Sequence, residues 1–380
     1  MDKNAIKKYA VWARRELISR VSQKALQYGI SEETSGDANA DTINGHLLTA
    51  AEKKQRQALI TKIKKDGYQQ AMEEAAYTWF NRFCALRYME VNGYLPTHVR
   101  VFSDEQNNFK PQIIAEAIHL ELDGLDMEKV YALKEENKTD ELYKYLLITQ
   151  CNALSAILPG MFQKIADYTE LLFPDNLLRE GSAIEQMIAL IPEEDWTDQV
   201  QIIGWLYQYY NTEPKDKVFA DLKKNIKISK ENIPAATQLF TPDWIVHYMV
   251  ENSLGRIFIV NSEECLATSE QVRIENEKAI AEKMGWKYYL PEAEQTPEVR
   301  SQLATNHYSL ATQLPSMKVI DPCMGSGHIL VVMFDVLVQI YEAYGYSARE
   351  AASMIVEHSG HRRACGAAEL FCRHDEGASV

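Results

Sequence analysis

The sequence predicts an α + α/β protein, in which a helical region at about residues 1–230 precedes the start of an α/β domain. Apolar residues recur every three or four positions through the first part of the chain, and the alternation typical of strands is scarce there. Near residue 320, a short apolar strand, a glycine-rich turn and a long apolar helix follow one another. Hydrophobic residues make up 46% and charged residues 25% of the chain, a composition that can bury a globular core.

The first predicted helix has one apolar face and a basic outer face. The apolar face is formed by Ile6, Ala10, Ala13, Leu17 and Val21. Gly29 follows and is a typical C-terminal stop, because glycine tolerates the left-handed conformation that ends many helices. Residues 31–41 have a turn-forming composition, and a second, basic helical stretch follows at about residues 53–65.

A third predicted helix begins near Met72 and ends at Asn92–Gly93. Its apolar positions are Ala75, Ala76, Trp79, Phe83 and Leu86. Residues 140–230 continue in the same helical style, with interruptions at Pro174, Pro192 and Pro214. We interpret the aromatic residues of this region as helix-bundle core rather than as ligand-binding groups, because such residues are usually buried.

Charge and cysteine content exclude few functions. The formal net charge is −14, yet residues 1–66 carry a net charge of +5 and residues 111–200 one of −12, so the total does not exclude a polyanionic partner. The six cysteines form no C-x-x-C pair, and we expect free thiols and no metal site.

No membrane span is predicted. The apolar run Ile329–Phe334 is far shorter than the roughly 20 residues that a membrane helix needs. The first residues carry frequent charges and lack the apolar core of a secretion signal, so we expect a cytoplasmic protein.

The residues with the clearest chemical meaning follow Met317. The pattern predicts a buried strand at Lys318–Asp321, a tight turn at residues 322–327 and a helix at residues 328–344. Gly325 and Gly327 lack side chains where the backbone must bend and approach a ligand, and the helix start presents free N–H groups there. The turn has neither the lysine of a P-loop nor the third glycine of a dinucleotide-binding turn.

The sequence D-P-C-M-G-S-G in this turn resembles motif I of the amino-methyltransferases that use S-adenosylmethionine. In that family, the acidic residue and the glycine turn hold the methionine part of the cofactor. The resemblance therefore implies cofactor binding by Asp321, Pro322, Cys323, Gly325, Ser326 and Gly327. The alternative interpretation is a glycine turn in some other α/β protein.

A second segment, upstream, resembles motif X of the γ-ordered DNA N6-adenine methyltransferases, Q-F-[YF]-T-P, with Leu239 in place of the first Phe. The resemblance implies that Phe240, Thr241 and Pro242 also contact the cofactor. Thr241 is placed to act as the N-cap of a helix, with Pro242 at its first position. The expected apolar face of that helix is Ile245, Val246, Met249 and Val250. A Thr-Pro helix start is common alone, but two motifs in the family's order are hard to obtain by chance.

Three helical segments, Tyr9–Ile18, Tyr77–Gly93 and Ile203–Tyr210, resemble the N-terminal region of the PglX family. These are adenine-specific DNA methyltransferases of BREX phage-exclusion systems and are similar to type IIG restriction-modification enzymes. The likeness covers essentially residues 1–357. It implies a helical region at residues 1–230 and the first part of a Rossmann-like class I methyltransferase domain at residues 231–357.

The same resemblance implies methyl transfer from S-adenosylmethionine to adenine N6 in double-stranded DNA, with other phage-defence proteins as further partners. Basic side chains of the first helices are candidates for salt-sensitive phosphate contacts. These are Lys7, Lys8, Arg14, Arg15, Lys53, Lys54 and Arg56. The alternative is that these side chains form ordinary solvated helix faces.

The chain lacks the N-P-P-[YFW] motif that, in this family, polarises the adenine amino group and stacks on the flipped base. None of the 12 prolines is adjacent to another. We therefore expect no catalytic residue in this chain and no activity from it alone. Because the chain ends before most of the sheet can form, we also expect the apolar helix at residues 329–340 to lack neighbours. The alternatives are a non-catalytic helical fragment that binds DNA or proteins, and a methyltransferase for RNA or protein.

The sequence Ser347-Ala-Arg-Glu350 predicts a capping box that opens one more helix. Residues 358–380 then show neither helical period nor the acidic strand end expected of the family. Reading the codons in the second frame permits an acidic strand end followed by an apolar helix. We interpret residues 358–380 as a frameshifted tail, and the alternative is a genuine divergent terminus.

Overall fold

The structure is a computed structural model that describes most of the chain. The described residues are 1–159, 161–162, 168–229, 232–237, 240–262, 265, 270–291, 293, 296, 314, 317, 319–321 and 327–358. The chain divides into two compact units, Met1–Gln238 and Leu239–Val380.

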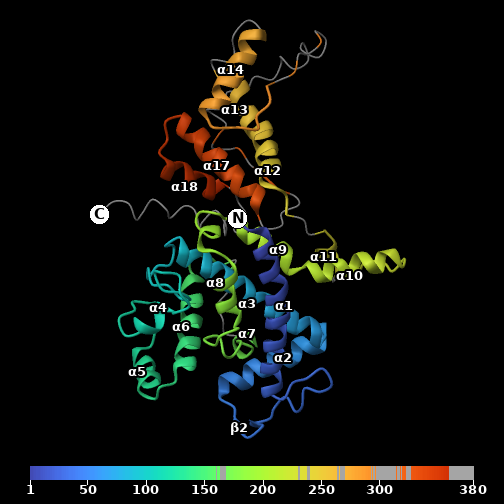
Figure 1. Ribbon diagram of the computed structural model, residues 1–380, viewed down its shortest axis with the longest axis vertical. Coiled ribbons are helices and arrows are strands. Elements are labelled where there is room, and N and C mark those ends of the chain that lie inside the picture. Colours follow the sequence, from blue (N-terminus) through green and yellow to red (C-terminus); the bar gives the residue numbers. More distant parts are fainter. Residues whose placement is uncertain are drawn as a thin grey trace. The chain divides into compact units, whose positions relative to one another are not determined.

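Helices dominate both units (Figure 1). Those of the first unit are α1 (Lys3–Gln27), α2 (Ala50–Asp66), α3 (Tyr68–Val91), α4 (Gln112–Ala115), α5 (Met127–Glu135), α6 (Thr139–Leu154), α7 (Tyr168–Leu171), α8 (Ala183–Leu190), the 3-10 turn η1 (Glu193–Asp195), α9 (Gln201–Tyr210), α10 (Thr212–Lys223) and α11 (Ile233–Thr237). Those of the second unit are α12 (Asp243–Val250), the π-helical turn η3 (Glu251–Gly255), α13 (Arg256–Val260), α14 (Glu270–Lys283), α17 (His328–Ala343) and α18 (Ala348–His358).

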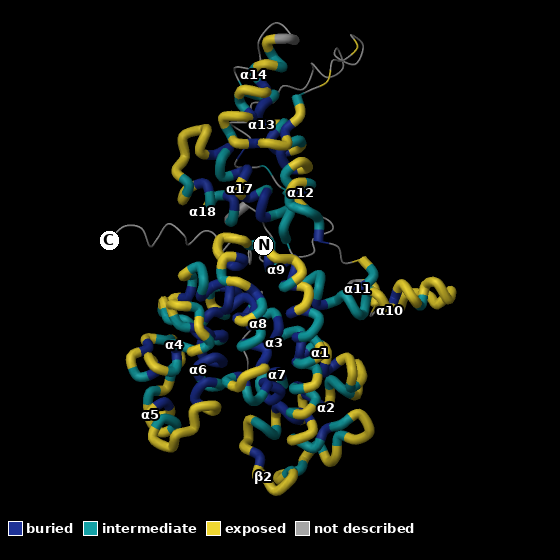
Figure 2. Tube along the Cα trace, in the orientation of Figure 1, coloured by how far each residue is buried: buried dark blue, intermediate teal, exposed yellow. Residues whose placement is uncertain are grey.

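The long helix α1 is the centre of the first unit, where it packs against α3, α8 and α9. Asp2 begins it, since its carboxylate accepts hydrogen bonds from the N–H groups of Asn4 and Ala5. All five residues of the predicted apolar face are buried, and Gly29 has the positive φ of 70° that a C-terminal stop requires. Both predictions for this helix are confirmed, and Figure 2 shows the buried positions along it.

The aromatic residues of α3 are core, as the periodicity predicts. The five predicted apolar positions are buried, and the indole of Trp79 is fully enclosed. Trp79 donates from Nε1 to the carbonyl oxygen of Thr169 at 3.0 Å and meets Phe173 edge-on, with ring centroids 4.7 Å apart. A buried indole needs such an acceptor, so α3 and α7 are fixed to each other through this side chain.

The described residues contain one small sheet, the hairpin of β1 (Thr42–Ile43) and β2 (His46–Leu47), in which Thr42 pairs with Leu47. Its two-residue turn is Asn44–Gly45, and both residues have positive φ. Asn-Gly is the preferred pair for such a turn, because it tolerates that conformation with the least strain.

The expected strand at Lys318–Asp321 and the Rossmann-like sheet are not seen among the described residues. Val319, Ile320 and Asp321 have no regular structure, and Ile320 is 73% exposed; Lys318 lies outside the described residues. A parallel strand is held by hydrogen bonds to a neighbouring strand, and no second strand of this unit is present in the described ranges. The described residues therefore do not contain the predicted strand or the predicted sheet.

The second unit has a core of its own, built around α17. Val332, Phe334, Val336 and Leu337 are buried in it, and α17 packs against α12, η3 and α18. The expectation that this helix lacks neighbours is wrong, because helices on two sides cover its apolar face. The predicted capping box of α18 is confirmed: Ser347 and Glu350 exchange hydrogen bonds at its first turn.

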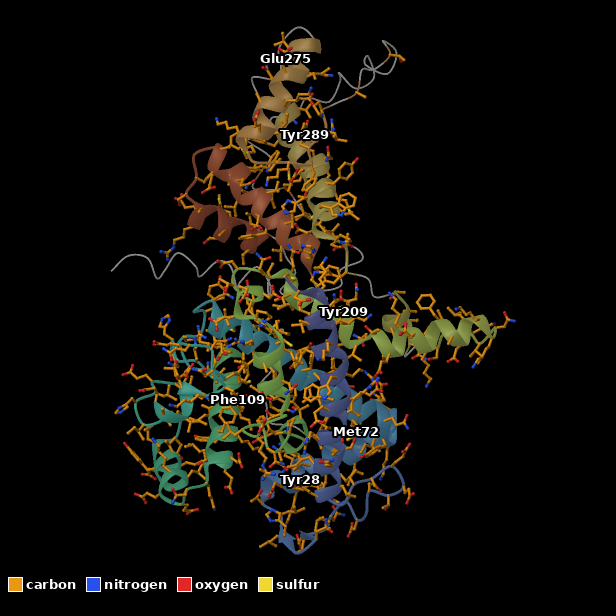
Figure 3. All side chains as sticks on the ribbon, viewed as in Figure 1. Tyr28, Met72, Phe109, Tyr209, Glu275 and Tyr289 are labelled. Atoms are coloured by element: carbon orange, nitrogen blue, oxygen red, sulfur yellow. The ribbon has the colours of Figure 1, made fainter. Side chains whose placement is uncertain are left out.

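Further contacts in the second unit involve aromatic side chains near α14. Tyr289, which is labelled in Figure 3, is buried, and its hydroxyl donates to Glu277 Oε2 at 3.0 Å. Trp286 is also buried and donates from Nε1 to Gln339 Oε1 at 2.7 Å. These two bonds join the segment after α14 to α14 itself and to α17.

Cys84 and Cys151 are buried free thiols, as expected, and Cys265 is also buried; the other three cysteines lie outside the described residues. Burial raises the pKa of the Cys151 thiol to about 12. None of the described helices combines the length and the apolar content needed to cross a bilayer.

Candidate cofactor site

Of the predicted motif I residues, the structure describes Asp321 and Gly327, and Gly327 stands at the start of α17. Gly327 is the N-cap of α17 and has a φ of 83°, in the left-handed region that favours glycine. It supplies no side-chain hydrogen bond to the helix, so the first N–H groups of α17 are not capped by a side chain. Asp321 is partly buried, whereas Pro322, Cys323, Gly325 and Ser326 lie outside the described residues.

The predicted motif X residues lie directly before α12. Phe240 is buried, and Thr241 and Pro242 are partly buried. The predicted N-cap is wrong by one residue, since α12 begins at Asp243 and Pro242 is its N-cap. The carbonyl of Pro242 accepts from the N–H groups of Ile245 and Val246, so the first helical hydrogen bonds start one position later than the Thr-Pro pattern predicts.

The predicted apolar face of α12 is also only partly correct. Val246 and Val250 are buried, whereas Met249 is 46% exposed. Trp244 and Tyr248 are exposed as well, one helical turn apart. One side of α12 therefore faces the core around α17, and an aromatic side faces away from it.

One contact brings the two predicted motifs together. The imidazole of His328, the first residue of α17, stacks on the ring of Phe240, with centroids 4.7 Å apart and planes inclined by 15°. His328 Nε2 also lies 3.2 Å from Asp243 Oδ1. Consistent with these contacts, α12 and α17 are packed side by side in the second unit (Figure 1). Asp243 and His328 are 85 positions apart in the sequence.

The electrostatics of His328 follow from its enclosure. Burial lowers the pKa of His328, whereas the carboxylate of Asp243 and the main chain of Thr241 act in the opposite direction. The ring is therefore neutral at neutral pH. A neutral imidazole can present its flat face to Phe240 and donate one N–H to Asp243.

Asp243 is also the first member of a row of polar side chains along α12 and η3. His247 Nε2 lies 3.8 Å from Asp243 Oδ1, and His247 Nδ1 lies 3.2 Å from Glu251 Oε1. Glu251 is buried in η3, and its Oε2 accepts from the N–H of Tyr288 at 2.7 Å. In the part of the chain that the structure describes, no three or more His, Cys, Asp or Glu side chains are arranged to hold a metal ion.

The sequence patterns missed His328 and Asp243. Each is adjacent to a predicted motif residue, and this adjacency was the available signal. No local periodicity predicts that two side chains 85 positions apart will meet, because that depends on how α12 packs on α17.

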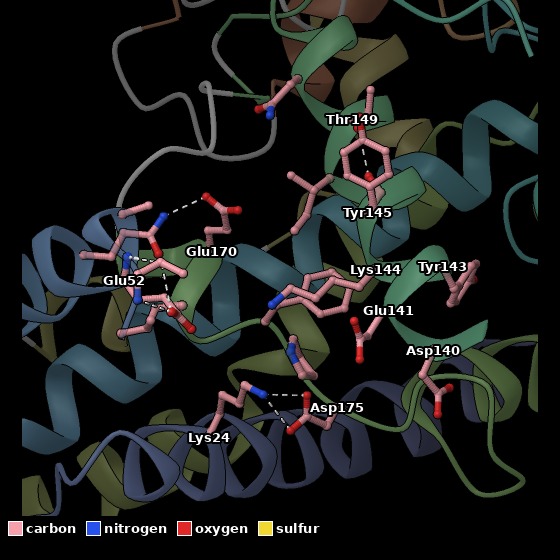
Figure 4. A pocket seen from close by; sticks show the side chains of 18 of the residues that line it. Lys24, Glu52, Asp140, Glu141, Tyr143, Lys144, Tyr145, Thr149, Glu170 and Asp175 are labelled. Carbon is pink, nitrogen blue, oxygen red and sulfur yellow. Dashed lines mark hydrogen bonds and ion pairs between the residues drawn. The ribbon is translucent and has the colours of Figure 1, made fainter. Parts of the chain in front are cut away.

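The first unit contains a cavity of about 1330 Å³, which lies among residues not predicted as a site. Its wall includes six carboxylates, from Glu52, Asp123, Asp140, Glu141, Glu170 and Asp175. Figure 4 shows Lys24 bonded to Asp175, with Lys144 on the neighbouring wall. Burial lowers the pKa of Lys144, and no ion pair involving its ammonium group is present among the described residues. Carboxylates repel phosphates, so this cavity does not suit the DNA backbone.

The basic side chains proposed for phosphate contact have different environments. Arg56 is fully buried and donates to the carbonyl oxygens of Tyr28, Ser35 and Asp37, so its assignment to phosphate is wrong. Arg14 pairs with Glu73, Arg15 with Glu213 and Lys53 with Asp41. Lys7, Lys8 and Lys54 are exposed. Burial therefore removes Arg56 alone, and the other six side chains stay candidates for phosphate contact.

Comparison with known proteins identifies the class. The chain is homologous over 94% of its length to two adenine-specific methyltransferases. Adenine-specific methyltransferase PglX of Lacticaseibacillus casei strain Zhang is 40% identical over 389 aligned positions, and adenine-specific methyltransferase BrxX of Escherichia coli O9:H4 strain HS is 38% identical over 376. No protein-family model matches the chain.

These relatives confirm the resemblance found in the sequence. The chain is a homologue of part of the PglX/BrxX adenine-specific methyltransferases. It covers 31% of the first relative and 29% of the second, and therefore spans about three tenths of their length.

Proposed function

We propose that this chain is the helical region and the beginning of the cofactor-binding domain of a DNA N6-adenine methyltransferase that uses S-adenosylmethionine. The complete activity is methyl transfer to adenine in double-stranded DNA as part of phage defence, as the relatives' class and the motif resemblance imply. The observation that carries the proposal is the stack of Phe240 on His328, because it places the motif X segment beside the start of the motif I helix.

The described residues fit the cofactor. Gly327 has a left-handed backbone conformation and no side chain, and apart from its chain neighbours no described residue has a heavy atom within 4 Å of the position that a Cβ would take there. The first N–H groups of α17 are suited to a carboxylate, because the positive end of a 16-residue helix attracts negative charge. S-adenosylmethionine, when bound, supplies the methyl group. Phe240, Thr241, Pro242, Asp321 and Gly327 are the described residues that we assign to holding it.

Methyl transfer to adenine, which follows cofactor binding, depends on an N-P-P-[YFW] motif that this sequence lacks. Without an N-P-P-[YFW] motif, no acceptor is present to localise the lone pair of the adenine amino group. We therefore assign cofactor binding to these residues and no catalytic step.

A pair of glycine substitutions tests the cofactor assignment. Gly327→Val forces a β-branched residue into the left-handed region at the start of α17, so we expect loss of S-adenosylmethionine binding. Gly345→Val is the matched control, because Gly345 has a φ of 92°, equally open surroundings and a position beyond the other end of α17. Binding is measured by calorimetry in the protein with the reading frame restored after residue 357, and by photo-crosslinking of labelled cofactor in the chain itself.

The proposal requires that the two variants differ. Unchanged affinity in Gly327→Val, or equal losses in both variants, would remove the assignment of the α17 start to the cofactor.

A further inference from the structure

The segment Phe240–Pro242 depends on side-chain contacts for its position. It belongs to no helix or strand, so no ladder of backbone hydrogen bonds fixes it. The His328 ring meets it at Phe240 and also bonds to Asp243, directly beyond its end. Both rings are nearly enclosed, with exposed fractions of 6% for Phe240 and 8% for the His328 side chain.

We infer that His328 is a positioning residue of the cofactor site: through Phe240 it holds the Phe240–Pro242 segment against the first turn of α17. The inference rests on the proposed function, because it concerns the same site. His328 acts on the segment in two ways, since the stack fixes the ring of Phe240 and the bond to Asp243 fixes the start of α12. Ordering this segment in advance reduces the entropy that cofactor binding must otherwise supply.

The protonation state of His328 gives the arrangement a measurable signature. Burial lowers the pKa of His328 below its ordinary value of 6.5, so opening of the segment is accompanied by proton uptake when the pH is below 6.5. The contact is therefore fully stable above that pH and weakens as the pH falls. The other titratable groups near it are Asp243 and His247 on α12, Glu251 on η3, and Asp335 on α17.

Amide hydrogen exchange of the 380-residue chain tests the inference. Two peptide regions are followed, 240–247 and 328–335, at about pH 7.5 and about pH 5.5, with rates corrected for the intrinsic effect of pH. His328→Asn removes the stack, and His328→Phe keeps a ring but cannot titrate or bond to Asp243. His247→Asn is the matched control, because His247 lies on α12 and faces the same carboxylate at 3.8 Å.

At the higher pH, we expect exchange of residues 240–247 to be about fivefold faster in His328→Asn than in the wild-type chain, the factor of one lost hydrogen-bonding contact. On acidification, exchange should accelerate in the wild-type chain and in His247→Asn, but not in His328→Phe. A histidine that only fills the core would not change the exchange of residues 240–247 selectively. Unchanged exchange in both His328 variants, or a pH response that disappears in His247→Asn instead, would overturn the inference.

Addition of excess S-adenosylmethionine separates this inference from the proposed function. If the cofactor slows exchange in the wild-type chain but less in His328→Asn, both are supported. If no protein shows a cofactor effect while the His328 variants open the segment, the cofactor assignment fails and the positioning contact stands. If the cofactor protects wild-type and His328→Asn equally, the site is supported and the positioning assignment fails.

Discussion

Gly255 lies in the π-helical turn η3, directly against the indole of Trp286. A Cβ added to Gly255 would be 2.8 Å from Trp286 Cζ3, which is closer than two carbon atoms can approach. The indole cannot move away easily, because it donates to Gln339 and meets Phe258 edge-on at 6.0 Å. We therefore expect Gly255→Ala to destabilise the second unit by about 1–3 kcal/mol, measured by urea denaturation.

The control for Gly255→Ala is the same substitution combined with Trp286→Leu. The smaller side chain removes the close contact, so the added cost of the alanine should disappear in that background. An alanine that costs nothing with Trp286 present would show that η3 does not need the close approach.

Glu90 and Arg87 form a buried ion pair in α3. The Glu90 carboxylate is buried, accepts from the N–H groups of Val101 and Phe102 at 2.7 and 2.8 Å, and pairs with the buried Arg87 at 2.5 Å. Glu90→Gln leaves the Arg87 charge without its closest partner. We expect a loss of about 3 kcal/mol in the free energy of unfolding of the first unit, followed by urea denaturation.

A double-mutant cycle checks that the cost comes from the unpaired charge. Combining Glu90→Gln with Arg87→Met removes both charges, and the combined loss should be smaller than that of Glu90→Gln alone. A combined loss equal to the sum of the single losses would contradict this explanation.

At the scale of single elements, the N-terminus of α2 gives a pH prediction. Burial alone would raise the pKa of Glu52, but hydrogen bonds from Thr49 and Tyr28 outweigh it and leave the pKa below its ordinary value of 4.5. A lowered carboxylate pKa contributes stability above 4.5 that is lost as the pH falls through the lowered value. Glu52→Gln keeps the capping geometry and loses this contribution.

We expect Glu52→Gln to lower the melting temperature of the first unit by about 2–4 °C at neutral pH, as a loss of about 1 kcal/mol implies. The difference from the wild-type chain should vanish in acid. Glu128→Gln is the matched control, because Glu128 lies exposed in the first turn of α5. A pH-independent difference between Glu52→Gln and the wild-type chain would show that the charge of Glu52 is not involved.

Helices and caps were predicted correctly where residues close together in the sequence determine them, and elements that need distant partners were not. The burial of the predicted faces of α1 and α3, the stop at Gly29 and the capping box of α18 were all correct, because periodicity and capping act within a few residues. The described residues of the expected strand, 319–321, have no regular structure, and a strand needs a partner from elsewhere in the chain that a local pattern cannot predict. The hairpin at Asn44–Gly45 was not predicted as strands, because two residues on each side are too few for a pattern.

The candidate site shows the same division between local and distant determinants. The sequence motifs assigned two segments to the cofactor, and the structure brings Phe240 and the start of α17 together. It did not predict Asp243–His328, because that contact depends on packing between helices far apart in the chain. Nor did it predict the burial of Arg56, whose three carbonyl partners lie in a loop that precedes α2.

At the scale of the whole molecule, the relation to PglX and BrxX concerns about three tenths of their length. Residues 359–380 lie outside the described residues, so the frameshift interpretation stays a prediction. Sequencing the gene beyond codon 357 tests it directly. We expect one inserted or deleted base whose correction gives an acidic strand end and an apolar helix; an intact second frame without such a pattern would contradict it.

The last prediction concerns activity. We expect the 380-residue chain to transfer no methyl groups to adenine in double-stranded DNA, although the protein with the frame restored does so. The amino lone pair of adenine is delocalised into the ring, and acceptors on the flipped base must localise it before it can attack a methyl group. The chain has a candidate cofactor site in Phe240 and Gly327 but no N-P-P-[YFW] acceptors.

The measurement compares incorporation of labelled methyl groups by the chain and by the frame-restored protein, with Gly327→Val in the second as the control. Circular dichroism of both proteins confirms that they are folded, so that inactivity has a chemical meaning. Methyl transfer by the chain itself would show that acceptors other than the missing motif exist in it. Inactivity of a folded, frame-restored protein that binds S-adenosylmethionine would instead remove adenine in duplex DNA as the substrate, because cofactor binding and the target motif would then both be present without the reaction.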